Sequence, residues 1–164
     1  MVDRKPHILV LFFLLIIFIF SAVRTLNEYR WSAWAIGDAQ NLVAARHFKD
    51  EGFFKHYLLT YYHPGYLGAS HGTESEIGYY THYPPLSAII NGFLMKYILD
   101  DFYFLKIIAV LFSVSGLYFF YKIISLVINK NIGLYATIFC GISVTFFEYV
   151  DCLSPFFMQY SFVY

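Results

Sequence analysis

The sequence predicts an all-α polytopic membrane protein, and three observations support that prediction. Of the 164 residues, 59% are hydrophobic and only 13% are charged, and the mean hydropathy is +0.57. Three runs, at 8–23, 107–121 and 132–147, contain no charged residue. Each reaches about 20 residues when flanking long side chains are included, which suits a hydrocarbon core ~30 Å thick. Between the first and second runs lies a polar segment with most of the acidic residues and histidines.

The charge balance and the missing motifs exclude several classes of protein. Eleven Lys and Arg residues offset eleven Asp and Glu residues, so no basic excess is present to bind nucleic acid. The two cysteines, Cys140 and Cys152, are too few for a disulfide scaffold or a four-thiolate zinc site. There is no GxGxxG, P-loop or GxSxG motif. We therefore expect no nucleic-acid partner and no nucleotide cofactor.

The N-terminal segment, 1–23, is predicted to be a short cytoplasmic end followed by the first transmembrane helix. Arg4 and Lys5 keep the N-terminus in the cytoplasm, which sends the following segment, 24–102, to the other side. An alternative interpretation of the first run is a secretory signal that ends at Ser21-Ala22. The later apolar runs favour the transmembrane helix.

The stretch 84–99 resembles a further span, but its charge-free part after Pro84, 85–95, is short and is closed by Lys96. Such a length favours an interfacial or re-entrant helix that starts at Pro84-Pro85. If this stretch crossed the membrane, Asp100 and Asp101 would face the cytoplasm. If it does not cross, the turn Asn129-Lys130-Asn131 faces the cytoplasm. The distribution of positive charge favours the second arrangement. The remaining predicted parts are the second transmembrane helix at 103–128, a cytoplasmic turn at 129–131, the third transmembrane helix at 132–150 and the start of a second external loop at 151–164.

Within the long external segment, 36–59 has apolar residues at roughly helical spacing, with charged residues between them. This pattern predicts an amphipathic helix on the membrane surface, with Gly52 as a residue that could end it. Asp38 at its start suits a helix cap or a first-turn acid. The segment 57–83 is rich in Tyr, His and Gly, which suits either membrane anchoring or a sugar or lipid-headgroup site. Composition leaves that choice open.

The order of these features resembles the N-terminal part of a known family. Three motifs carry the resemblance, namely WAIGDA at 34–39, DEGF at 50–53 and YTHYPPL at 80–86. They are similar to the GT-C glycosyltransferases that use polyprenyl-phosphate sugars, such as protein O-mannosyltransferases and lipid A aminoarabinose transferases. The resemblance implies a GT-C-like module with interfacial helices before the second span. It also implies transfer of a sugar from a polyprenyl-phosphate donor to a protein, lipid or glycan on the extracytoplasmic side.

The resemblance implies specific roles for four residues. Asp38 matches the principal catalytic acid, and a carboxylate there would act as general base on the acceptor. A divalent metal ion or another cation would stabilise the phosphate leaving group. His82 is the candidate metal or phosphate contact, and Tyr83 and Asp151 are candidate substrate or phosphate contacts. The expected location is the plasma membrane in a prokaryote or the endoplasmic reticulum membrane in a eukaryote.

The sequence also departs from the family pattern. Many relatives have a second acid directly after the first, where this chain has Ala39. Asp151 is the nearest candidate for the acid of the second external loop. Family members are several times longer, so we expect the chain to be a fragment or a truncated form. The main alternative is a non-enzymatic small membrane protein whose polar loop binds a lipid or a partner subunit. A transporter fragment is less favoured, because the predicted spans are nearly free of ionisable residues.

Overall fold

The computed structural model describes residues 5–27, 35–55, 57–62, 78–80 and 85–153. It divides into two compact units, one formed by 1–33 and 106–152, the other by 34–105 and 153–164. Each unit is described by itself below. The described residues form six helices and one short pair of strands, so the fold is helical, as predicted, with a small β addition that the sequence did not predict.

The first unit contains two helices that are long and apolar enough to cross a membrane. They are α1 (Lys5–Asn27) and α4 (Phe102–Val127), which agree with the predicted first and second spans. On α1, Val10, Leu14 and Ile17 are buried, whereas Phe12 and Ile19 are exposed. Large apolar side chains on an outer face are costly in water and favourable in lipid. The two helices therefore indicate a membrane protein.

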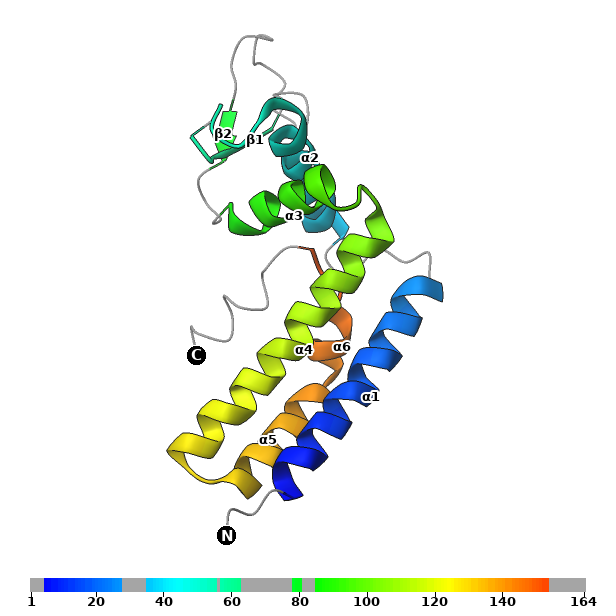
Figure 1. Cartoon of the computed structure of the whole chain (residues 1–164), viewed down its shortest axis with the longest axis vertical. Helices are drawn as coiled ribbons and strands as arrows, with labels where there is room; N and C mark the ends of the chain where they lie inside the picture. The colour runs from blue at the N-terminus through cyan, green and yellow to red at the C-terminus, as the bar shows by residue number, and fades with distance from the viewer. Residues whose placement is uncertain (1–4, 28–34, 56, 63–77, 81–84, 154–164) are drawn as a thin grey trace. The chain divides into compact units, whose positions relative to one another are not determined.

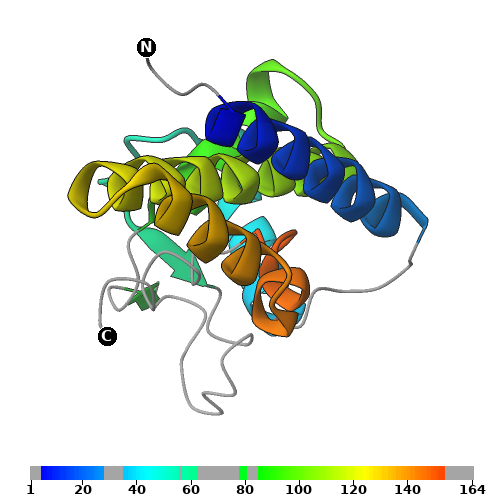
Figure 2. The same ribbon diagram turned by 90° about the horizontal axis from the view of Figure 1, so that it is seen from below.

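The region of the predicted third span is divided into α5 (Lys130–Gly141) and α6 (Val144–Tyr149). Ser143 causes the division, because its Oγ donates to the Cys140 carbonyl at 2.7 Å and accepts the N–H of Phe146 at 3.1 Å. A helix the length of α5 spans about 18 Å, which is less than the ~30 Å hydrocarbon core. A crossing by 132–150 therefore stays a prediction. Helix α5 packs against α1, and α1, α4 and α5 run alongside one another in two views (Figure 1 and Figure 2).

The second unit is built on the packing of α2 (Ala35–Glu51) against α3 (Leu86–Tyr97). Ala44 and Phe48 of α2 form a buried cluster with Ala88 of α3. Helix α2 ends where expected, because Gly52 adopts a φ of +97° that favours glycine, and its N–H bonds the Phe48 carbonyl at 3.1 Å. Helix α3 lies within the stretch predicted to be an interfacial helix.

A short antiparallel pair of strands also belongs to this unit. Strand β1 (Thr60–Tyr62) pairs with β2 (Gly78–Tyr80), with Thr60 opposite Tyr80. Both strands come from the tyrosine-rich segment 57–83, for which no strand was predicted. Aromatic and β-branched residues favour strands, but the pairing joins residues far apart in the sequence, which a local pattern does not reveal.

Gly92 allows α2 and α3 to approach closely, and this gives a first prediction. A Cβ at position 92 would lie 2.8 Å from the Ala45 carbonyl oxygen and 2.9 Å from the Phe48 Cβ. We expect Gly92→Ala to lower the stability of the protein by about 1–3 kcal/mol, as overpacking does. The measurement is thermal unfolding in detergent. Gly116→Ala is the control, because a Cβ at position 116 would meet nothing within 4 Å and alanine favours a helix. Equal stability of the two variants would contradict the close packing.

Candidate functional site

Asp38 lies in the first turn of α2, as the sequence predicted. The residue is fully buried, and its Oδ1 accepts the backbone N–H of Leu153 at 2.7 Å. A carboxylate in a first turn interacts favourably with the positive end of the helix dipole. The N–H bond in addition gives the buried carboxylate a hydrogen-bond donor. Burial, dipole and hydrogen bond thus hold this acid in one place.

A buried amide network extends from this position to α3. Asn41 lies one turn after Asp38, and its Nδ2 donates to Ser87 Oγ at 2.7 Å. Asn91 Nδ2 donates to Asn41 Oδ1 at 2.7 Å and makes a long contact, 3.5 Å, with the Leu153 carbonyl. Leu153 is therefore contacted at both its backbone groups, with Asp38 at its N–H and Asn91 at its carbonyl. Buried polar groups joined in this way specify one arrangement of the two helices.

The sequence interpretation missed the roles of Asn41 and Asn91. Asn91 is the one polar residue in the run 88–95, and a buried amide there needs a partner. Asn41 follows Asp38 by three residues, which places both on one helix face. These two signals could have indicated the network, although neither indicates that Leu153 belongs to it.

The end of α2 is fixed by an ion pair. Lys49 Nζ lies 2.6 Å from Asp100 Oδ2, and both side chains are partly exposed. This hydrogen bond raises the pKa of Lys49 above its ordinary value. The ion pair joins α2 to the segment that leads into α4.

Asp151, the second candidate acid, belongs to the first unit and is buried. Its Oδ2 accepts from Thr25 Oγ1 and from Lys106 Nζ, each at 3.3 Å. Arg24 lies 3.6 Å from its Oδ1. The carboxylate thus joins the end of α1 to α4 and lies beside two cations, whose combined charge it balances only in part. These contacts suit a structural ion-pair centre, and the predicted substrate or phosphate contact by Asp151 stays a prediction.

The sequence interpretation gave Lys106 no role. The residue lies just before the charge-free run, inside both the predicted span 103–128 and α4. Its side chain is 1% exposed. A buried lysine in such a helix needs a partner, and Asp151 supplies it.

The other candidate residues, His82 and Tyr83, lie outside the described residues. Within the described part of the chain, no three His, Cys, Asp or Glu side chains gather closely enough to hold a metal ion. The surroundings of Asp151 are cationic, which does not suit a divalent cation. The donor sets of the described residues therefore do not fit a metal, and no reaction step below depends on one.

Comparisons with protein-family models, with curated proteins and with solved structures find no match to this chain. The described residues form a helical protein with two helices able to cross a membrane. Two buried polar centres, at Asp38 and at Asp151, are its candidate sites.

Proposed function

We propose that the protein is a membrane glycosyltransferase, or part of one, that uses a polyprenyl-phosphate sugar donor and Asp38 as general base. One observation carries the proposal. Asp38 Oδ1 holds a hydrogen-bond donor, the Leu153 N–H, at 2.7 Å within a buried site. An acceptor hydroxyl that replaced this N–H would lie at the distance that proton transfer requires.

The reaction needs few groups. Asp38 takes the proton of the acceptor hydroxyl as the hydroxyl oxygen bonds to the anomeric carbon of the sugar. The bond between that carbon and the phosphate oxygen breaks, and polyprenyl phosphate leaves with the electron pair. His82 and Tyr83 remain the candidate contacts to the phosphate. A lipid-linked donor requires a protein in or on the membrane, which the two apolar helices support.

The test is sugar transfer in membranes from cells that express the protein. Polyprenyl phosphates carrying radiolabelled hexoses, pentoses or aminopentoses are supplied one at a time. We expect label from at least one donor to move into the protein, lipid or glycan fraction, with release of polyprenyl phosphate. Membranes that lack the protein give the background. Label that remains on every donor at the background level would contradict the proposal and favour a non-enzymatic membrane protein.

A further inference from the structure

One end of the first unit carries basic side chains that come from three helices. His7 lies in the first turn of α1, Lys122 lies near the end of α4, and Lys130 begins α5. Lys122 and Lys130 both lie close enough to His7 to act on it electrostatically. We name these three residues the basic cluster. His7 is far from the two lysines in the sequence, so the fold assembles the cluster.

Tyr121 of α4 joins the three helices at this end. The residue is fully buried. Its hydroxyl lies 3.1 Å from His7 Nδ1, and the two rings meet edge to face with their centres 5.3 Å apart. A Cβ at Gly133 of α5 would lie 3.1 Å from the Tyr121 carbonyl oxygen, so the start of α5 packs closely on α4. The positions of the basic residues are therefore set by buried contacts.

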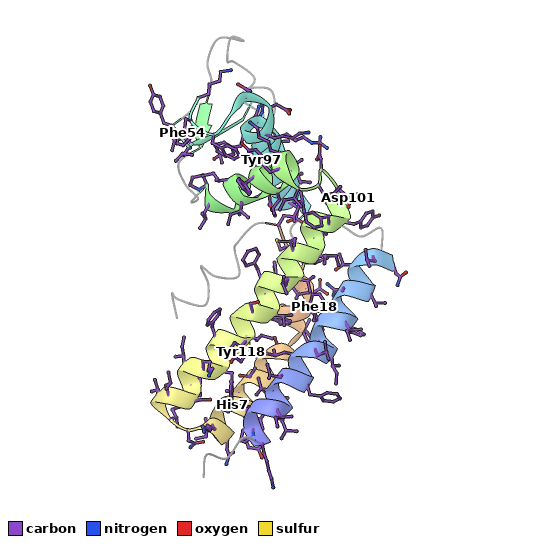
Figure 3. All side chains as sticks on the ribbon, viewed as in Figure 1. His7, Phe18, Phe54, Tyr97, Asp101 and Tyr118 are labelled. Atoms are coloured by element: carbon purple, nitrogen blue, oxygen red, sulfur yellow. The ribbon has the colours of Figure 1, made fainter. Side chains whose placement is uncertain are left out.

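The contact with Tyr121 also leaves the other ring nitrogen of His7 for a ligand. When the tyrosine hydroxyl donates to Nδ1, the neutral ring carries its proton on Nε2, and Nε2 is then a hydrogen-bond donor. Lys122 Nζ lies 5.7 Å from the centre of the Tyr118 ring. Figure 3 labels His7 on α1 and Tyr118 on α4.

Among the described residues, no carboxylate offsets the basic cluster. The described acids of the first unit are Glu148 on α6 and Asp151 directly after it. Asp151 contacts Thr25, which lies about 27 Å along α1 from His7. Positions 3 and 4, outside the described residues, hold one acid and one base. This end of the unit therefore has an excess of positive charge, which suits an anion.

The surroundings of the basic cluster favour a lipid over a soluble anion. Ile123, Leu126 and Val127 of α4 are 56%, 85% and 77% exposed, and acyl chains would cover these side chains whereas a soluble anion would not. Because α1 and α4 are candidate spans, their ends fall at the depth of the headgroups. The sequence predicts that this end is cytoplasmic, and the cytoplasmic leaflet carries anionic lipids.

We propose that the basic cluster binds the phosphate group of an anionic phospholipid. Lys122 and Lys130 supply two ammonium groups, and His7 Nε2 supplies a hydrogen-bond donor to the phosphate oxygens. The acyl chains lie on the exposed apolar side chains at the end of α4. The bound phosphate offsets the repulsion between the two lysines and so stabilises this end of the unit. The proposal goes beyond the proposed function and does not depend on Asp38.

The test is the association of spin-labelled lipids with the full chain in phosphatidylcholine vesicles at low salt. The spectrum separates lipid whose motion the protein restricts from bulk lipid. We expect the protein to restrict phosphatidylglycerol more than phosphatidylcholine. Lys122→Gln and Lys130→Gln should each lower this preference by up to about fivefold, the effect of one lysine near an anionic lipid surface. Lys122→Arg should retain it because the charge is kept.

Lys55→Gln is the matched control, because it removes the same charge from an exposed lysine of the second unit. It should retain the preference. Lys122 is exposed, and Lys130 follows the cap residue Asn129, whose side chain accepts the Ile132 N–H. Both glutamine variants should therefore fold, and circular dichroism checks their helix content.

Three results would overturn the proposal. The first is equal restriction of the two lipids by the wild-type protein. The second is a preference that Lys122→Gln and Lys130→Gln lower no more than Lys55→Gln does, because the lipid would then bind elsewhere or respond to net charge alone. The third is loss of the preference with inorganic phosphate but not with sodium chloride at equal ionic strength, which would identify a site for a soluble anion.

Discussion

Replacement of Asp38 by Asn is expected to lower sugar transfer by ~10²–10⁴-fold, the usual contribution of a general base. The amide is nearly isosteric with the carboxylate, and its oxygen can still accept the N–H of Leu153. Asn also suits the start of a helix as well as Asp does. The variant should therefore fold normally and lack only the ability to take a proton. The measurement is transfer of labelled sugar in membranes, normalised to the amount of protein.

Asp50→Asn is the matched control, because Asp50 lies on the same helix with an exposed side chain. It should retain full transfer. Wild-type transfer by the Asp38→Asn variant at equal expression would leave Asp38 with a role in helix stability alone. That result would remove the main support for the proposed reaction.

Replacement of Lys106 by Met is expected to destabilise the protein by about 3–5 kcal/mol, the usual cost of leaving one member of a buried ion pair without its partner. Lys106 donates to Asp151 at 3.3 Å from a side chain that is 1% exposed. Arg24 lies farther from the carboxylate, 3.6 Å, and is more exposed, so it should compensate only in part. The measurement is the free energy of unfolding in mixed detergent micelles.

The double variant Lys106→Met, Asp151→Asn tests the cause. In the Asp151→Asn background, which lacks the buried charge, Lys106→Met should lower the free energy of unfolding much less than it does in the wild type. The difference between the two effects gives the coupling energy between the residues. Lys122→Met is the control, since Lys122 lies on the same helix and is exposed. Its contact with the Tyr118 ring is worth no more than about 1 kcal/mol. Equal losses from Lys106→Met and Lys122→Met would rule out a stabilising ion pair.

Several elements follow from local patterns. The long apolar runs predicted α1 and α4 because length and lack of charge are local properties. Gly52 correctly suggested the end of α2 because its conformation is a property of one residue. Hydropathy did not reveal the division between α5 and α6, since Ser143 is compatible with an apolar run and acts through two short hydrogen bonds.

The candidate site was predicted only in part. The place of Asp38 in a first turn could be predicted from the residues around it. Its partner could not, because Leu153 lies 115 residues later in the chain. The same holds for Asn41 with Asn91, which are 50 residues apart. Lys106 lies inside the predicted span 103–128, but its partner Asp151 comes 45 residues later, which a local pattern does not reveal. Periodicity showed that α2 has an apolar face but not that α3 covers it.

The contact between Asp38 and Leu153 also sets an order of events during synthesis. With 115 residues between them and synthesis at about 5–20 residues per second, Leu153 is made roughly 6–23 s after Asp38. Helices α2 and α3 are complete well before that time, and pairing between them can begin once both have emerged. Leu153 therefore reaches Asp38 last, after α4, α5 and α6 have been translated. Until then, the growing chain carries Asp38 without this hydrogen bond.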